Sequence, residues 1–362
     1  MGEPNTPFYV LDFESFYEET FNVTLDDSTV YEMNEKTLIC ADAALPTVVR
    51  VVMSCFYIHI FLVALPGNLV VGLVVRSCKQ SLSPSDVYLF HLAVADTLLA
   101  LTLPFWAASL VWGWVFGGTL CKLVSLVREV NFYSSILFLV CISVDRYLVI
   151  VRAMETRRER RRLWSWVVCG AVWAAGAVLS LPVLYHEVFV PKGQEQAVCM
   201  ENSDPENARA LRLVTRLLRH TLGFLLPLAA MLGCYCVTVA RLLRTRGFQK
   251  QRAMRVIVAV VAAFLLCWTP YHAAAMADTL MRARVVGYGC AARQAVDLAL
   301  FATQSLGLLH CCVNPVLYAF IGEKFRRNLL HLCRRKGGLE RGSASRYSRS
   351  TSQTSEAISP VM

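Results

Sequence analysis

A single carboxylate lies among apolar residues in the second of several long apolar stretches of this chain. Asp96 falls within Leu92–Leu103, and Asn131, Ser135 and Asn314 fall at comparable depths of other stretches. An ionisable group inside a membrane span needs a partner or water, so it is a functional candidate by default. Carboxylate, hydroxyl and amide oxygens suit a hard cation, most simply sodium. Two interpretations stay open: an allosteric sodium site, or a protonated Asp96 in a structural hydrogen-bond network.

A second polar group, Asp145-Arg146-Tyr147, lies at the end of the third apolar stretch. Two charges cost little at the membrane–water boundary and several kcal/mol at mid-bilayer, so we expect the tripeptide at the boundary. A tripeptide there can be uncovered when helices move, which is typical of a switch. Segment 241–255 contains no acidic residue, so Arg146 is expected to pair with its own neighbour, Asp145.

Two proline motifs lie in later apolar stretches, Cys267-Trp268-Thr269-Pro270 and Asn314-Pro315-Val316-Leu317-Tyr318. A proline removes a backbone hydrogen bond and bends a helix, but a lone proline is common in membrane helices. A large ring or an Asn–Tyr pair beside the bend is more specific. These motifs add Trp268, Pro270, Asn314, Pro315 and Tyr318 to the candidate switch residues.

The elements that must position these groups are membrane helices. The 362 residues are 56% hydrophobic and only 17% charged, which indicates a membrane protein. Several stretches are long enough to cross a bilayer as helices. We predict seven of them, in an all-α membrane protein with a seven-transmembrane helix bundle. They run over Val48–Val75, Val87–Val111, Leu120–Val151, Leu163–Leu184, Leu213–Leu243, Val256–Met276 and Ala295–Ile321.

Charge sets the expected orientation. Linkers 152–162 and 241–255 each carry six Arg or Lys residues, whereas 185–210 is acidic. Positive linkers stay cytoplasmic, so we expect a plasma membrane protein with an extracellular N-terminus and a cytoplasmic C-terminus. The net charge of +10 therefore reflects topology, and no basic patch alternating with aromatics predicts nucleic-acid binding. The sequon at Asn22 predicts glycosylation and argues against the N-myristoylation pattern at Gly2.

Composition divides the chain into four regions. Residues 1–45 form an acidic extracellular segment, in which Tyr17 beside two glutamates is a sulfation candidate. Residues 46–321 form the bundle. Residues 322–334 have the pattern of a short amphipathic eighth helix at the inner leaflet. Residues 335–362 form a Ser- and Thr-rich cytoplasmic tail whose phosphorylation would add strong negative charge.

Four of the fourteen cysteines are expected on the oxidising outer side: Cys40, Cys121, Cys199 and Cys290. Four cysteines allow three pairings. Cys121 opens the third helix, and Cys199 lies midway in a long loop. We favour Cys121–Cys199 with Cys40–Cys290, because this pairing ties that loop down and closes the outer ring of the bundle. No cysteine or histidine cluster at zinc spacing occurs in the sequence.

Taken together, the motifs resemble the rhodopsin-like G-protein-coupled receptors over about residues 45–335. The matching elements, in order, are Asn68, Leu92-Ala93-Val94-Ala95-Asp96, Asp145-Arg146-Tyr147, Trp173, Pro227 and the two proline motifs. Narrower features resemble the CXC chemokine receptors, and most nearly the interleukin-8 receptors. They include Thr102-Leu103-Pro104, Trp114-Val115-Phe116-Gly117, Glu129-Val130-Asn131-Phe132-Tyr133-Ser134 and His310-Cys311-Cys312-Val313-Asn314-Pro315.

The resemblance implies a receptor that binds basic CXC chemokines outside. The acidic N-terminal segment would steer a basic ligand inward. Gln304 stands where most chemokine receptors carry Glu, so ligand contacts are least transferable at that position. The candidate ligand-binding residues are Tyr17, Trp106, Arg128, Arg212, Arg216, Asp278, Arg282, Asp297 and Gln304. The arginines among them can pair with an acidic group of the ligand.

The resemblance also implies activation of inhibitory-class G proteins inside, in support of leukocyte chemotaxis and calcium signalling. Receptor kinases and arrestin are the expected partners of the phosphorylated tail, and no cofactor is expected beyond an allosteric sodium ion. No nucleophile–base constellation is visible, so we expect a non-enzyme. Two alternatives are a non-signalling chemokine scavenger receptor, against which the intact Asp145-Arg146-Tyr147 argues, and a transporter, which would predict internal repeats.

Overall fold

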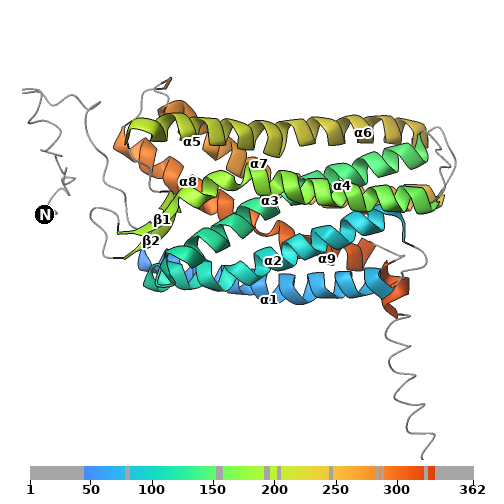
Figure 1. Cartoon of the computed structure of the whole chain (residues 1–362), viewed down its shortest axis with the longest axis horizontal. Coiled ribbons are helices and arrows are strands. Elements are labelled where there is room, and N and C mark those ends of the chain that lie inside the picture. Colours follow the sequence, from blue (N-terminus) through green and yellow to red (C-terminus); the bar gives the residue numbers. More distant parts are fainter. Residues whose placement is uncertain are drawn as a thin grey trace, which may run out of the picture.

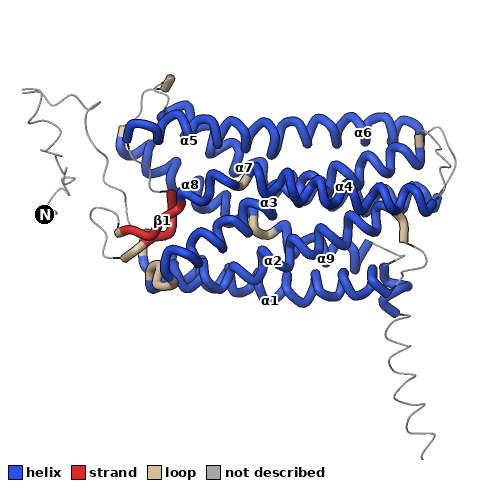
Figure 2. Tube along the Cα trace, in the orientation of Figure 1, coloured by secondary structure: helices blue, strands red, loops and turns tan. Residues whose placement is uncertain are grey.

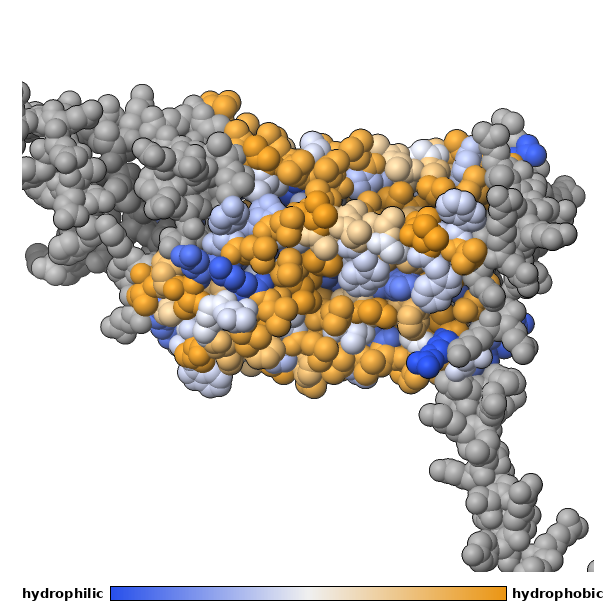
Figure 3. Space-filling view, in the orientation of Figure 1, coloured by the Kyte–Doolittle hydropathy of each residue, from blue (hydrophilic) through white to orange (hydrophobic). Residues whose placement is uncertain are grey.

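The computed structural model describes residues 45–77, 82–151, 158–190, 196–201, 205–243, 248–282, 285–286, 289–321 and 325–330. Seven spans are long and apolar enough to cross a membrane, and they lie side by side along one long axis (Figure 1). The predicted seven-helix bundle is therefore confirmed. Hydrophobic side chains cover most of the visible bundle between its two ends (Figure 3), as expected of a surface that faces lipid.

The first four spans are single helices: α1 (Thr47–Ser77), α2 (Pro84–Trp112), α3 (Gly117–Ile150) and α4 (Arg158–Leu179). The helix α2 begins three residues before its predicted start because a capping box forms there. The Ser83 side chain accepts from the Asp86 backbone N–H, and the Asp86 carboxylate accepts from the Ser83 N–H. A 3-10 turn, Leu181–Tyr185, follows α4.

The fifth span has an irregular centre. The helices α5 (Pro205–His220) and α6 (Leu226–Leu243) are joined by the π-helical turn η4 (Thr221–Leu225). Pro227 lacks an N–H, and in a regular helix its ring would clash with the carbonyl of Gly223. A widened turn relieves that clash and often marks a functional site. The sixth span is α7 (Phe248–Arg282), which contains Pro270.

The seventh span is divided into α8 (Cys290–Gly307) and α9 (His310–Ile321) by a turn at Leu308 and Leu309. The sequence predicted one unbroken helix here. The His310 Nδ1 atom lies 2.7 Å from the Gly307 carbonyl and donates to it. The side chain thus takes a carbonyl that a regular helix uses for its own ladder. Tighter bonds, such as Leu309 N–H to Leu306 O at 3.1 Å, replace that ladder locally.

A two-stranded antiparallel hairpin lies at one end of the bundle, in addition to the predicted helices (Figure 2). Strand β1 (His186–Phe189) pairs with β2 (Val198–Glu201), and Val188 lies opposite Cys199. The Trp114 backbone N–H donates to the Ala197 carbonyl at 2.7 Å. Gly113, with φ of 77°, permits this approach, because a Cβ there would lie 3.0 Å from the same carbonyl oxygen.

We predict that Gly67→Ala lowers thermal stability. A Cβ at Gly67 would lie 2.9 Å from Cβ of Pro315, whose ring cannot rotate away. Overpacking of this kind costs about 1–3 kcal/mol. The apparent midpoint of thermal unfolding in detergent should fall by several degrees. Gly170→Ala is the matched control, because nothing lies within 4 Å of its added Cβ. An equal midpoint for both variants would contradict the prediction.

Candidate functional site

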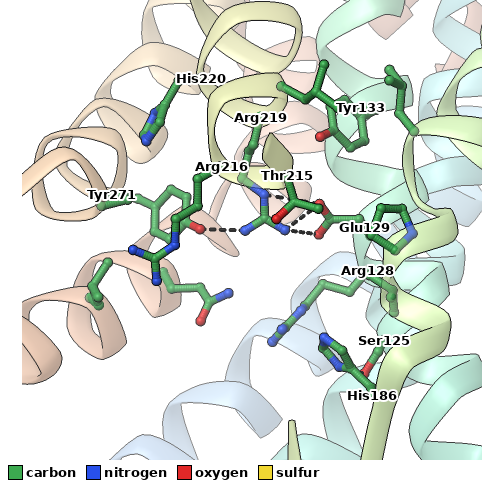
Figure 4. A pocket seen from close by; sticks show the side chains of 17 residues that line it. Ser125, Arg128, Glu129, Tyr133, His186, Thr215, Arg216, Arg219, His220 and Tyr271 are labelled. Carbon is green, nitrogen blue, oxygen red and sulfur yellow. Dashed lines mark hydrogen bonds and ion pairs between the residues drawn. The ribbon is translucent and has the colours of Figure 1, made fainter. Parts of the chain in front are cut away.

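A cavity of about 260 Å³ lies in the half of the bundle that carries the hairpin. Its walls come from α3, α5, α7, α8, the last residue of α4, the 3-10 turn and β1. Polar side chains converge in it, most of them from α3 and α5 (Figure 4). The volume is too small for a folded protein and suits a few side-chain-sized groups. Any protein ligand would therefore place only a terminus or a loop in this pocket.

Arginines dominate the electrostatics of this pocket. Arg216 and Arg219 are three residues apart on α5, so they share one helix face, and Arg128 faces them from α3. A buried arginine needs an opposite charge or a set of acceptors. The partners of each arginine therefore decide which positive charge remains available to a ligand.

Arg219 is fully engaged. It contacts both carboxylate oxygens of Glu129 on α3, and its Nε lies 3.1 Å from Glu129 Oε1. It also donates to the hydroxyl of Tyr271 on α7. Its guanidinium lies 5.6 Å from the centre of the Phe132 ring. This one side chain therefore links three helices (Figure 4).

Arg216 is also paired. It forms an ion pair with Asp278, a fully buried carboxylate on α7. Asp278 pairs in turn with Arg293 on α8, which reaches Asp297 at 2.8 Å one turn along the same helix. Three residues proposed from the sequence as ligand contacts, Arg216, Asp278 and Asp297, therefore belong, with Arg293, to one chain of ion pairs that ties α5, α7 and α8 together.

Arg128 differs from these two arginines. Its guanidinium lies 4.6 Å from the centre of the Trp106 ring, in a cation–π contact. Among the described residues it has no hydrogen bond or ion pair with a carboxylate, and no dashed line in Figure 4 ends at it. The indole N–H of Trp106 is buried and likewise without an acceptor in the described part of the chain. Gln304, a neutral side chain, lines the same pocket.

Several predicted residues cannot be placed in this site. The side chains of Arg212, Arg282 and Tyr318, and all of Tyr17, Asn22 and Cys40, lie outside the described residues. The Cys121–Cys199 disulfide is present, with Cα atoms 5.7 Å apart, and it joins the hairpin to α3. Cys290 is disulfide-bonded as well. Its predicted partner, Cys40, belongs to the undescribed part.

Deeper in the bundle, Asp96 is buried and surrounded by neutral donors. Its Oδ1 accepts from Asn131 Nδ2 at 3.1 Å and from Ser135 Oγ at 3.4 Å, and its Oδ2 accepts from Asn314 Nδ2 at 2.9 Å. The His310 Nε2 atom lies 3.6 Å from Oδ1. The structure thus brings together all four residues that the sequence grouped.

Aromatic rings separate this polar layer from the pocket. Trp268 packs against Phe132, with ring centres 4.8 Å apart, and against His310 at 5.6 Å. Gly307 lies directly against its indole, since a Cβ there would be 3.0 Å from Trp268 Cζ3. Trp268 therefore contacts the rings below the pocket on one side and the Asp96 layer on the other.

At the end of the bundle opposite the hairpin, Asp145 is buried and accepts a hydrogen bond from Ser85 Oγ on α2. The Arg146 Nη2 atom lies 3.7 Å from Asp145 Oδ2, as the sequence predicted for neighbours without another acid nearby. Tyr235 on α6 bonds to Ser143 on α3 at 2.8 Å. Because Ser143 donates to the Leu139 carbonyl, the Tyr235 hydroxyl is the donor of that bond. Tyr147 directly follows Arg146 on α3.

Several polar residues in or beside the pocket were not predicted from the sequence. Glu129 is an ionisable residue inside a predicted span, the same signal that identified Asp96. Arg219 continues the three-residue spacing of Arg216. His220 and His272, which bond to each other, gave no signal beyond being polar residues in apolar stretches.

Comparisons with known proteins agree with this architecture. Residues 67–318 match the family model described as 7 transmembrane receptor (rhodopsin family). The chain is 47% identical over 312 residues to C-X-C chemokine receptor type 1 of Oryctolagus cuniculus, which covers 86% of this chain and 87% of that protein. It is 47% identical over 293 residues to C-X-C chemokine receptor type 2 of Homo sapiens, with 81% of each chain covered.

We predict that Asp278→Asn destabilises the outer end of the bundle. The change leaves two arginines without their shared carboxylate, and removal of one partner from a buried ion pair costs about 3–5 kcal/mol. The midpoint of thermal unfolding should fall clearly. Asp297→Asn is the control, because its side chain is 39% exposed and pairs within one helix. Loss of such a pair costs about 0.3–0.5 kcal/mol, so a similar fall in both variants would contradict the assignment.

Proposed function

This chain belongs to the rhodopsin family of seven-transmembrane receptors and, within it, to the CXC chemokine receptors; from that premise we propose that it binds basic CXC chemokines of the interleukin-8 type and activates inhibitory-class G proteins. It is a multi-pass membrane receptor and not an enzyme. In the proposed orientation the pocket and hairpin face outside, Asp145-Arg146-Tyr147 faces the cytoplasm, and receptor kinases and arrestin act on the Ser- and Thr-rich tail.

The observation that carries the ligand proposal is the charge of the pocket. Glu129 pairs with Arg219, and Asp278 pairs with Arg216. Among the arginines that line the described pocket, this leaves Arg128 without a carboxylate partner. A half-buried cation of this kind favours entry of one anion. The guanidinium of Arg128 and the indole N–H of Trp106 are donors that suit a carboxylate. We therefore assign Arg128 as the anchor of an acidic residue near the chemokine N-terminus.

Signalling then follows from differential binding. The ligand favours a bundle arrangement in which α7 pivots about Pro270, so that its cytoplasmic end swings outward. Tyr147 and Tyr318 then rearrange and make Arg146 available to the G protein. The receptor makes and breaks no covalent bond. Trp268 supports this route physically, because it packs between the pocket layer and the Asp96 layer.

We predict that Arg128→Gln raises the chemokine concentration for half-maximal guanine-nucleotide exchange, measured in reconstituted membranes with an inhibitory-class G protein. A hydrogen bond to a charged group contributes about 1.5–3 kcal/mol, so the shift should be about 10- to 100-fold. A chemokine whose N-terminal Glu is replaced by Gln should lose potency by the same factor on the unaltered receptor. On the Arg128→Gln receptor, that chemokine and its unaltered form should be equally potent.

Lys122→Gln is the control, because it removes a cation from the same helix outside the pocket lining. Unchanged potency of Arg128→Gln would reject the anchor. Chemokine binding without any nucleotide exchange would favour the scavenger alternative.

We also propose that the Asp96 layer holds an allosteric sodium ion. The carboxylate of Asp96, the hydroxyl of Ser135 and the amide oxygen of Asn131 are oxygen donors of the kind that a hard cation takes. The Asn131 Nδ2 atom faces Asp96 at 3.1 Å, so the amide would turn over to direct its buried, unpaired Oδ1 atom to the ion. The alternative is a proton on Asp96, which the same neutral neighbours also accommodate.

Agonist affinity should respond to sodium if the ion binds the resting bundle. We predict about a fivefold loss of agonist affinity when sodium chloride replaces choline chloride, within the usual range of allosteric coupling. Asp96→Asn and Ser135→Ala should each reduce that response. Thr97→Ala is the control, because its hydroxyl bonds to the Ala93 carbonyl instead. Equal affinity in both salts would favour the proton.

A further inference from the structure

The Arg219–Glu129 ion pair spans the pocket itself. Glu129 is a buried residue of α3, 8% exposed, and both of its carboxylate oxygens contact the Arg219 guanidinium. All three nitrogens of that guanidinium are used, with Nε and Nη2 on Glu129 and Nη1 on Tyr271. The position of the guanidinium is therefore fixed by α3 and α7 together, although its own backbone belongs to α5.

The next residue of α5 makes a second link to α7. The Nδ1 atoms of His220 and His272 lie 2.9 Å apart, so one ring donates and the other accepts. The Phe224 ring stacks on His272 with centres 4.1 Å apart. Two consecutive residues of α5 thus bond to two consecutive residues of α7, next to the π-helical turn and one helical turn outside Trp268.

Charge balance connects this link to the ligand. In the cluster of Arg128, Glu129 and Arg219, two cations face one carboxylate, which leaves one positive charge. One acidic group from a ligand brings the cluster to neutrality whichever arginine it contacts. If the acidic group first anchored by Arg128 moves on to Arg219, Glu129 can pair in turn with its sequence neighbour Arg128, and the cluster still holds no unpaired carboxylate. Once the ligand's acidic group is in the cluster, exchanging partners between the two arginines leaves the total charge of the cluster unchanged at zero.

We propose that Glu129 occupies, in the resting receptor, the place that the ligand's acidic group takes on Arg219, so that the ion pair is an autoinhibitory contact opened by carboxylate exchange. Arg219 then selects a carboxylate-bearing ligand, and its release from Glu129 frees α5 and α7 from α3. This inference rests on the proposed function in that an acidic group of the ligand enters the pocket.

The test uses the full-length receptor in membranes without agonist. Glu129→Gln and Arg219→Gln should each raise basal guanine-nucleotide exchange about fivefold or more, the scale of ordinary allosteric coupling. The double variant should show no further rise, because both changes break one contact. Tyr271→Phe, which keeps the ring, should give a smaller rise. Arg50→Gln is the control: this arginine bonds to Gln196 at 2.6 Å, away from the pocket lining, and basal exchange should not change.

Ligand responses distinguish this role from a purely structural one. Glu129→Gln removes the internal competitor for Arg219, so an acidic chemokine N-terminus should gain potency. Arg219→Gln should reduce the potency difference between that chemokine and its Glu→Gln form. A fall in thermal midpoint with unchanged basal exchange and unchanged discrimination would overturn the inference.

The two proposals fail in different ways. Spin labels at the inner ends of α3 and α7 report the resting distance without any chemokine or G protein, and Glu129→Gln should lengthen it. Lengthening without any chemokine response would reject the proposed function and keep the autoinhibitory contact. A normal chemokine response, with the distance and basal exchange of Glu129→Gln both unchanged, would reject the contact alone.

Discussion

Burial of charge in an apolar bundle is the constraint on which the rest of this structure depends. Among the described residues, four carboxylates are buried at successive depths, and each one is compensated differently. Asp278 has two arginines, Glu129 has one, Asp96 has amide and hydroxyl donors with His310 at 3.6 Å, and Asp145 has Ser85 and a neighbouring arginine at 3.7 Å. Because an isolated buried charge is strongly unfavourable, each compensation fixes helices relative to one another.

These layers are joined by packing rather than by a continuous polar path. Trp268 contacts Phe132 on the pocket side and His310 on the Asp96 side, and Gly307 leaves no space beside its indole. A close-packed contact of this kind has few intermediate positions, so a change in the pocket favours a discrete rearrangement over gradual deformation. A contact shows only that two layers are close together. Energetic coupling between them is measured by the effect of the Glu129 and Arg219 variants on basal nucleotide exchange.

The sequence predicts most of the architecture and part of the site. The seven spans, the Asp96 group and the Cys121–Cys199 disulfide follow from long apolar stretches, rare intramembrane polar residues and cysteines expected on the outer side. Local competition escaped prediction: the His310 side chain takes the Gly307 carbonyl and divides the last span. Long-range pairing escaped as well, because Arg219 and Glu129 are 90 residues apart and nothing local to either residue identifies the other.

The distribution of these contacts indicates where the resting state is held. At the inner end, Asp145 and Arg146 are neighbours on one helix, so their ion pair cannot join two helices. At that end, the hydrogen bonds of Ser85 and Tyr235 join α3 to α2 and to α6. At the pocket, by contrast, Arg219 links α3 to α7, and His220 links α5 to α7. Within the described chain, the polar contacts that hold α7 to α3 and α5 therefore include a cluster at the pocket end of the bundle.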